Sequence, residues 1–219
     1  MRTTRYDTWA FWTATDTKPA LGTGMKFTKM HGSLNDYAVI DGRGLDYSWG
    51  DLARQACNRR TGIGADGILV VLSSTVADIR MGMFNPDGSE AEMCGNGIRC
   101  LAKYVLDRGV CGTENGLLTV ETLSGIKTIQ PTWYGDKVTQ ARVDMGYAEL
   151  NPSKIPVDIA DGTTPTLDYS LKIGEFDLNL AFVSMGNPHA VAFIDTPVEK
   201  ILPSSLARLI VDKVFSEDI

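Results

Sequence analysis

One stretch of the chain decides its fold: Asn85-Pro-Asp-Gly-Ser-Glu-Ala-Glu-Met-Cys-Gly-Asn-Gly-Ile-Arg-Cys100, continued by Leu101-Ala-Lys-Tyr-Val-Leu-Asp107. Its first four residues are typical of a turn, and they end an apolar, strand-like run over residues 79–84. From Ile98 onward the apolar residues follow i, i+3, i+4 and i+7 spacing, and Gly109 supplies a stop. The stretch therefore predicts a strand, a turn, a loop and one helix with a strongly apolar face.

Cys94 lies where that loop meets the helix N-terminus. Backbone N–H groups without partners and the positive end of the helix dipole favour an anion at such a position, so they would stabilise a thiolate. Gly95 and Gly97 allow the backbone to approach a ligand closely. The setting favours a reactive thiol beside a carboxylate-bearing substrate over the alternative, in which Cys94 is a small buried hydrophobic residue.

Short strands and hairpins are expected over most of the remaining chain. Periodicity and turn residues predict strands over residues 26–30, 37–41, 68–72, 79–84, 117–122, 126–129, 137–145, 171–173, 176–182 and 190–194, and helices over 51–60 and part of 197–214. A sheet that curls around the apolar helix would bury it, so we predict an α+β fold with a barrel-like sheet. The pattern begins again after about residue 138, which predicts a second, similar unit that is incomplete.

These patterns divide the chain into three parts. Residues 1–24 are rich in Thr and aromatic side chains, but they lack an apolar core long enough for a signal peptide. We interpret them as a disordered extension or as the product of an upstream start codon, with Met25 as the usual start; the alternative is a docking segment. Residues 25–138 are expected to form an N-terminal domain with Cys94, and residues 139–219 a partial C-terminal domain.

Composition narrows the class of protein. The 219 residues are 43% hydrophobic and 22% charged, which is ordinary for a soluble globular protein. The 21 basic and 27 acidic residues give a net charge of −6, which argues against nucleic acid or an anionic membrane surface as a partner. No run of about 18 apolar residues occurs, so no transmembrane helix is expected.

The four cysteines, Cys57, Cys94, Cys100 and Cys111, form no CxxC pair. Because only two histidines accompany them, a structural zinc site is not expected. Nothing marks the chain as secreted, so we expect a cytoplasmic location with reduced thiols. Cys100 lies near the apolar stripe of the helix and is expected in the core, while Cys57 and Cys111 are interpreted as structural.

His31 and His189 both lie in loops rich in glycine or asparagine. A thiol hydrolase would need a histidine base within hydrogen-bond reach of the nucleophile, for example His189 beside Cys94. Each histidine is equally consistent with a residue that supports a site and with a structural hydrogen-bonding residue.

Four asparagines, Asn35, Asn85, Asn96 and Asn187, lie in loops beside glycine, proline or aspartate. Asparagine is a common turn residue, so each alone is weak evidence. Side-chain amides both donate to carboxylates and accept from ammonium groups. Together they would therefore suit a neutral, polar site for an amino acid.

Four motifs resemble those of diaminopimelate epimerases. They are Lys29-Met-His-Gly-Ser-Leu-Asn-Asp36, Gly62-Ile-Gly-Ala-Asp66, the stretch from Asn85 to Cys100, and Met185-Gly-Asn-Pro-His189. Their order and spacing are similar to the family from about residue 25 to about residue 195. Asn96 after Cys94-Gly95 favours this family over the proline racemases, which share the fold and tend to carry histidine there.

The resemblance implies two similar domains, each a curled sheet around a central helix. It also implies an enzyme of lysine biosynthesis that interconverts LL- and meso-diaminopimelate without pyridoxal phosphate or a metal. Two cysteines would face the α-carbon from opposite sides, one as thiolate base and one as thiol acid. Carried over by position, Cys94 is one of this pair and acts as donor or acceptor according to the direction of the reaction; the family usually assigns it as the proton donor.

The resemblance also implies substrate contacts. Residues that match substrate-binding positions are Asn35, Asn85 and Asn187, with Gly95 and Asn96 as donors to the α-carboxylate; His31 and His189 are kept as site-supporting candidates. Gly67 falls where some members carry a substrate-contacting glutamine, so that contact is absent. The expected partner is the small-molecule substrate diaminopimelate, without cofactor, nucleic acid or membrane, and the family pattern allows a homodimer.

One departure from the family concerns the second thiol. Members continue with a Glu-Arg-Gly segment and a second Cys-Gly-Thr-Gly-type motif, neither of which occurs between Ile194 and Ile219. We therefore expect the chain, as a fragment or as a truncated product with a divergent tail, to lack the second catalytic cysteine and to show little activity by itself. The alternative is a non-catalytic relative that binds an amino acid through the retained half-site.

Overall fold

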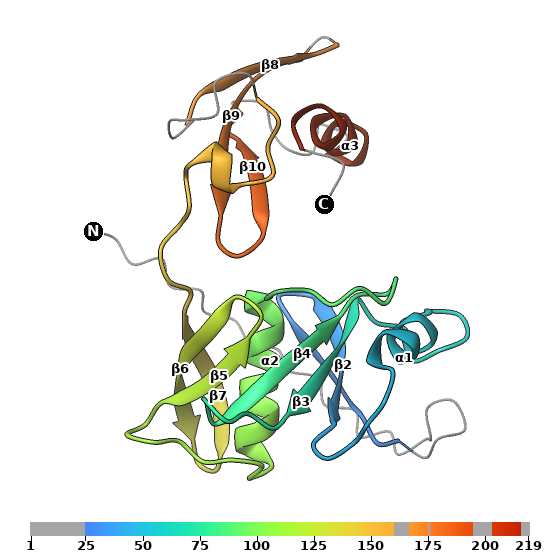
Figure 1. Ribbon diagram of the computed structural model, residues 1–219, viewed down its shortest axis with the longest axis vertical. Coiled ribbons are helices and arrows are strands. Elements are labelled where there is room, and N and C mark those ends of the chain that lie inside the picture. The colour runs from blue at the N-terminus through green and yellow to red at the C-terminus, as the bar shows by residue number, and fades with distance from the viewer. Residues whose placement is uncertain (1–24, 160–166, 175, 195–202, 216–219) are drawn as a thin grey trace. The chain divides into compact units, whose positions relative to one another are not determined.

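The computed structural model divides into two compact units, one that ends at Met145 and one that begins at Gly146, and each is described by itself (Figure 1). The described residues are 25–159, 167–174, 176–194 and 203–215. The N-terminal extension expected over residues 1–24 lies outside them.

The first unit is built on a seven-stranded sheet whose strands lie side by side in sequence order. The strands are β1 (Thr28–Gly32), β2 (Asn35–Asp41), β3 (Gly67–Leu72), β4 (Ile79–Phe84), β5 (Leu118–Thr122), β6 (Gly125–Tyr134) and β7 (Lys137–Asp144). The pairs β2–β3 and β4–β5 are parallel, and the other neighbours are antiparallel. The domain boundary expected between residues 138 and 139 falls inside β7, which is paired along its length with β6.

Helix α2 (Gly95–Asp107) is the central element of this unit, and it contacts β1, β2, β3, β4, β6 and β7. Because β1 and β7 are the two edges of the sheet, one helix can reach both only if the sheet curls around it (Figure 1). The face formed by Ile98, Leu101, Ala102 and Val105 is fully buried, as its spacing predicts. The α+β fold with a sheet curled around a helix is therefore confirmed here.

The C-terminal half of α2 is fastened to β7 by a buried pair of opposite charges. Lys103 Nζ lies 2.8 Å from Asp107 Oδ2, one helical turn away. The same ammonium donates to the Val138 carbonyl at 2.5 Å, and the Val138 N–H donates to Asp107 Oδ1 at 2.8 Å. The pair thus satisfies both backbone groups of one strand residue.

Helix α1 (Trp49–Ala56) packs on the opposite face of the sheet from α2. Ile68 and Val70 of β3 pack in the α1 cluster, whereas Leu69 and Val71 pack in the α2 cluster. Successive side chains of a strand point to opposite faces, so a strand that is covered on both sides is apolar throughout. This explains the continuous apolar run that follows Gly67.

The expectation that α1 continues to Arg60 is wrong, because the helix ends at Ala56. The N–H groups of Gly64 and Ala65 in the following loop donate to the carbonyls of Ala56 and Cys57, at 3.0 and 3.2 Å. These carbonyls are the ones that a longer helix would have used. The glycine-rich loop therefore folds back to close the helix end.

The described part of the second unit contains a three-stranded antiparallel sheet in the order β10-β9-β8 and an α-helix. Its elements are η1 (Pro152–Lys154), β8 (Tyr169–Ile173), β9 (Phe176–Ser184), β10 (Pro188–Ala192) and α3 (Pro203–Val214). Leu180, Phe182 and Val214 form the centre of its core. No helix in the described ranges of either unit is long and apolar enough to span a membrane.

One expectation for the second unit needs correction, and another is borne out over the described residues. β10 begins at Pro188, so His189 lies in a strand rather than in a loop. The helix expected within residues 197–214 is described from residue 203, and residues 195–202 lie outside the described part.

Candidate active site

Cys94 occupies the N-cap position of α2, immediately before its first helical residue. Its backbone is extended, with φ −140° and ψ 121°, and its carbonyl accepts the first helical hydrogen bond from the Ile98 N–H at 2.9 Å. Its side chain makes no capping hydrogen bond. The N–H groups of the first turn therefore point toward the thiol side of the helix end, where an anionic ligand would be stabilised.

The thiol of Cys94 has a buried partner on the sheet. Tyr37 Oη lies 3.1 Å from Cys94 Sγ, and Tyr37 is only 1% exposed. Burial, the hydrogen bond with Cys94 and the nearby charge of Asp66 raise the pKa of Tyr37 well above its ordinary value. The phenol therefore keeps its proton at neutral pH.

The turn between β1 and β2 brings Asn35 to the same helix end. A six-residue loop was expected from His31 to Asp36, but the strands are joined by only two turn residues, Ser33 and Leu34, with φ of 51° and 72°. Positive φ at both positions is characteristic of the tight turns that suit the twist of a β-hairpin. The turn is therefore compact, and it fixes the position of Asn35.

A chain of polar contacts links this turn to α2. Asn96 Nδ2 donates to Asn35 Oδ1 at 2.7 Å, and Asn35 Nδ2 donates to Asp66 Oδ2 at 3.4 Å. Arg99, one turn along the helix, donates to Asn96 Oδ1 and, at 3.4 Å, to Ser33 Oγ. Burial lowers the pKa of Arg99. The contacts orient both amides at the start of the helix.

Charged side chains support the same turn from outside. Asp36 accepts from Arg59 and lies 2.8 Å from Lys29 Nζ, while Arg59 also donates to Asp66 at 2.7 Å. Burial raises the pKa of Asp36, but the hydrogen bonds from Arg59 and Lys29 outweigh burial and hold that pKa well below its usual range. The network joins the start of β2 to the loop before β3.

Close packing also fixes the helix end. A Cβ on Gly32, the last residue of β1, would lie 2.9 Å from the Asn96 carbonyl oxygen and 3.4 Å from Cys100 Sγ. A Cβ on Gly67 would lie 2.9 Å from the Phe84 carbonyl oxygen and 3.6 Å from the Tyr37 ring. Real Cβ atoms do not approach backbone oxygen so closely, so a larger residue at either position would force the backbone to shift.

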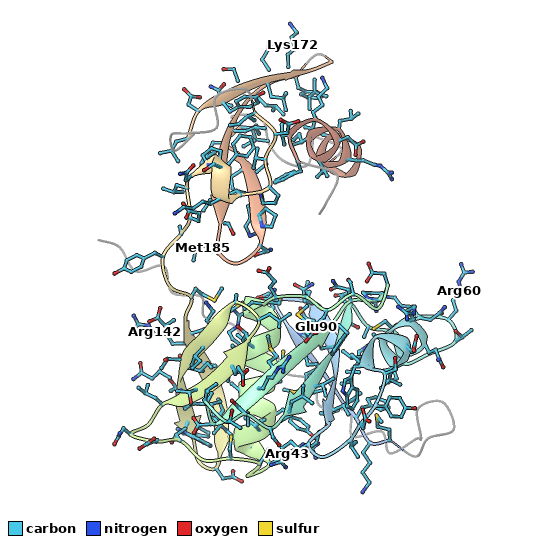
Figure 2. All side chains as sticks on the ribbon, viewed as in Figure 1. Arg43, Arg60, Glu90, Arg142, Lys172 and Met185 are labelled. Carbon is cyan, nitrogen blue, oxygen red and sulfur yellow. The ribbon has the colours of Figure 1, made fainter. Side chains whose placement is uncertain are left out.

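Asn85 lies at the end of β4, next to the start of β3, because Phe84 pairs with Ile68. Its N–H donates to the Ser89 carbonyl at 2.9 Å and its amide donates to Ser89 Oγ at 3.0 Å. Figure 2 shows Glu90 on the loop that leads from this turn to α2, and its carboxylate lies 3.7 Å from Arg80 on β4. Asn85 is thus held at the site end of the sheet by its own turn.

The other three cysteines differ from Cys94 in their surroundings. All four cysteines are free thiols. Cys57 and Cys100 are buried, and burial raises their pKa values to about 11 and about 12. Burial also raises the pKa of Cys111. These three remain protonated at neutral pH, in keeping with structural roles.

The remaining sequence-predicted residues are placed as follows. His31 lies on β1, paired with Asp36, and its buried Nδ1 has no hydrogen-bond partner among the described residues. Asn187 and His189 belong to the second unit, where His189 Nε2 lies 3.2 Å from Asn187 Oδ1. The structure therefore gathers Asn35, Cys94, Gly95 and Asn96, whereas the part played by His31 and the second-unit pair stays a prediction.

Three further residues at this end were not singled out from the sequence: Tyr37, Asp66 and Arg99. Tyr37 follows Asn35 by two residues on one strand, and such residues lie on the same face, so the spacing could have identified it. Asp66 and Arg99 fall inside quoted motifs, but nothing in the sequence indicates that their partners are asparagines. Among the described residues, no group of three or more His, Cys, Asp or Glu is arranged to hold a metal ion.

The arrangement combines a partly exposed thiol, first-turn N–H groups that have no acceptor among the described residues, and two oriented amides. The N–H groups can bind a carboxylate, and amide oxygens can accept from an ammonium group. A thiol at this position can give or take a proton. The site therefore suits proton transfer on a ligand of amino-acid type.

Solved structures of similar fold include amino-acid racemases and epimerases. A hydroxyproline epimerase from Agrobacterium vitis, with bound trans-4-hydroxy-L-proline, matches with a TM-score of 0.57 at 14% identity, over 77% of this chain and 51% of that one. A probable proline racemase from Agrobacterium radiobacter matches with a TM-score of 0.58 at 15% identity, over 76% and 51%. The chain thus has the fold of this class of proteins.

Sequence comparison specifies the family within that fold. The diaminopimelate epimerase family model matches residues 27–151. Diaminopimelate epimerases from Methanococcus maripaludis and Desulforudis audaxviator are 43% and 47% identical over 184 and 171 residues, which cover 82% and 77% of this chain. The chain belongs to the diaminopimelate epimerase family. The matches span 65% and 60% of those relatives' own lengths.

Proposed function

We propose that this chain acts in the interconversion of LL- and meso-diaminopimelate, with Cys94 as one of two thiols that exchange a proton at the α-carbon. The observation that carries the proposal is the position of Cys94 Sγ at the uncapped N-terminus of α2, beside the linked amides of Asn35 and Asn96. Membership in the family supplies the substrate class.

The chemistry fits these groups. An α-proton is weakly acidic, so its removal needs stabilisation of the charge that develops on the α-carboxylate. The N–H groups of Gly95 and Asn96 at the helix start would provide it in the manner of an oxyanion hole. The amides of Asn35 and Asn85 would bind the polar ends of the substrate. No pyridoxal phosphate or metal takes part in the proposed steps.

Inversion needs a second acid on the opposite face of the α-carbon. Cys57 and Cys100 are buried, and Cys111 follows the far end of α2, so we do not assign this role to any of the three. We propose that the second thiol is supplied by sequence other than these 219 residues. The chain by itself would then remove and return the α-proton on one face and produce little inversion.

Incubation of the full chain with LL-diaminopimelate in D2O tests the proposal. We expect α-deuterium incorporation, read by mass spectrometry, without a matching yield of the meso isomer. Cys94→Ala should slow incorporation at least about a hundredfold, the contribution of a general base, while Cys111→Ala should leave it unchanged. Incorporation that survives Cys94→Ala would contradict the role of Cys94, and fast inversion would contradict the assignment of the second thiol.

The alternative is a non-catalytic member that binds an amino acid through the same half-site. The hydrogen-bonded amides of Asn35 and Asn96 fit this alternative as well as they fit catalysis, because their role in either case is to bind the ligand. Calorimetric titration with diaminopimelate and with unrelated amino acids separates the two. Selective binding with no deuterium incorporation would establish the binder.

A further inference from the structure

We propose that Tyr37 is a positioning residue that donates a hydrogen bond to the Cys94 thiolate and thereby increases the fraction of Cys94 that is ionised. The proposal rests on the proposed function in that Cys94 is taken as the acid/base group. It adds a residue from within β2 to a site otherwise formed by the first residue of β2, by turns and by a helix end.

Within the described part of the chain, the phenol hydroxyl has one hydrogen-bond partner. Tyr37 Oη lies 3.1 Å from Cys94 Sγ, and the residue is 1% exposed. Among the described residues, Cys94 is the hydrogen-bond partner of this hydroxyl. A buried hydroxyl without a partner is destabilising, so the contact with the sulfur contributes to stability as well.

The packing around the ring holds the hydroxyl in place. Tyr37 belongs to the α2-facing core together with Leu69 and Ile98, and it pairs with Gly67 of β3. A Cβ on Gly67 would be 3.6 Å from the ring, so the ring lies directly against the glycine backbone. A side chain that is fixed in this way loses little further freedom when it hydrogen-bonds the sulfur.

The hydroxyl can serve Cys94 in both of its protonation states. Burial raises the pKa of Tyr37, so the phenol remains a donor when Cys94 is a thiolate. When Cys94 is a thiol, its S–H can donate to the phenol oxygen instead. A thiolate that accepts one hydrogen bond keeps other lone pairs for the substrate proton. Tyr37 therefore holds the sulfur without taking part in the proton transfer.

Other charged or titratable groups near this pair lie on α2 and in the loop before β3. The Arg99 guanidinium and the Cys100 thiol interact electrostatically with Cys94, and Asp66 acts on Tyr37 from the loop before β3. Arg99 lies further along α2 and donates hydrogen bonds to Asn96 and Ser33. Tyr37 makes a direct hydrogen bond with the sulfur.

The test is the alkylation of Cys94 by iodoacetamide as a function of pH, followed by mass spectrometry of the Cys94 peptide in the full chain. Because a hydrogen bond to a charged group is lost, Tyr37→Phe should slow alkylation at pH 7 about three- to tenfold and move the midpoint of the rate profile to higher pH. The rate at high pH, where all thiols are ionised, should not fall.

Two controls separate this effect from a general loosening of the fold. Tyr104→Phe, on α2, removes a half-buried hydroxyl away from Cys94 and should leave the midpoint unchanged. Site-specific 3-fluorotyrosine at position 37 is a stronger donor and should move the midpoint to lower pH. An unchanged midpoint in Tyr37→Phe, with the protein still folded by circular dichroism, would overturn the proposal.

The alkylation experiment tests the role of Tyr37 separately from the proposed function, which deuterium incorporation tests. If the midpoint moves but diaminopimelate gains no deuterium, Tyr37 has the assigned role and the proposed function fails. If deuterium enters through Cys94 and the midpoint does not move, the proposed function stands and the role of Tyr37 fails. If Tyr37→Phe does not fold, the fluorotyrosine protein gives the decisive measurement.

Discussion

The two ends of α2 are held in different ways. At the C-terminal end, Lys103 and Asp107 have side chains only 10% and 15% exposed, and they bind both backbone groups of Val138. At the N-terminal end, partly exposed Cys94 and Asn96 are held by contacts with the β1–β2 turn and with Tyr37. The C-terminal end is fixed by a buried ion pair, whereas the first-turn N–H groups of the N-terminal end have no acceptor among the described residues.

The different contacts at the two ends of α2 place the stabilising interactions at one end of the helix and the candidate functional groups at the other. An uncapped helix N-terminus forgoes the stabilisation, typically about 1 kcal/mol, that a capping side chain would give. The buried pair and the apolar face of Ile98, Leu101 and Val105 offset that loss from within the core. We therefore expect changes at the C-terminal end to alter stability alone, and changes at the N-terminal end to alter the reactivity of Cys94 as well.

The largest effect on stability is expected from Asp107→Ala. The change leaves the Lys103 ammonium and the Val138 N–H in the core without their carboxylate, and the loss of one member of a buried pair costs about 3 kcal/mol. Chemical denaturation measures this as a fall in the free energy of unfolding. Asp136→Ala, which removes a carboxylate that is 89% exposed, should change it by less than about 0.5 kcal/mol.

The same pair of proteins tests the separation of the two ends. The alkylation rate of Cys94 in folded Asp107→Ala should equal that of the unchanged chain under conditions where both are fully folded. A slower rate, or a shifted pH profile, would mean that the buried pair controls the site and that the two ends are not independent.

The pattern of the sequence located the buried elements better than the exposed ones. Strand β4 was predicted over its full length, because both its ends are marked by changes from apolar to polar residues. Strand β6 was predicted only to Ile129, but it continues to Tyr134 through residues that are largely exposed. The exposed part of a hairpin has no regular alternation of apolar and polar residues, so no hydrophobic period shows how far the strand extends.

The candidate site was predictable in part for a similar reason. Cys94, Gly95 and Asn96 are consecutive, so a helix start placed them correctly. The Asn35–Asn96 contact joins residues 61 positions apart, and no local spacing carries that information. The network of Lys29, Asp36, Arg59 and Asp66 likewise depends on how a turn and a loop meet in space.

The second largest effect on stability is expected from Gly32→Ala, at the site end of α2. The new Cβ would lie 2.9 Å from the Asn96 carbonyl oxygen, so β1 or the first helical turn must move, at a cost of about 1–2 kcal/mol. Because the movement disturbs the helix start, the alkylation rate of Cys94 should change too. Gly112→Ala, where nothing lies within 4 Å of the added Cβ, is the matched control.

Gly32→Ala and Asp107→Ala together sharpen the comparison. Both lower stability, but only the first should alter Cys94. If Gly32→Ala lowers the free energy of unfolding and leaves the alkylation profile as it was, the packing of β1 on Asn96 is structural and does not position the thiol.

The smallest effect is expected from Asp36→Asn, which asks how much charge contributes at the site end. The variant weakens the contacts with Lys29 and Arg59 and should lower the free energy of unfolding at pH 7 by about 1 kcal/mol, a modest value because the network lies near solvent. The pKa of Asp36 is lowered in the folded chain, so its contribution is fully present above the unfolded value of about 4 and is lost as the pH falls below it. The stability gap between the unchanged chain and Asp36→Asn should therefore narrow between about pH 4 and pH 2, whereas Asp136→Asn should stay close to the unchanged chain at both pH values. A gap that stays constant through this range would show that Asp36 acts through shape and neutral hydrogen bonds. The negative charge of Asp36 would then make no contribution to stability at the site end of α2.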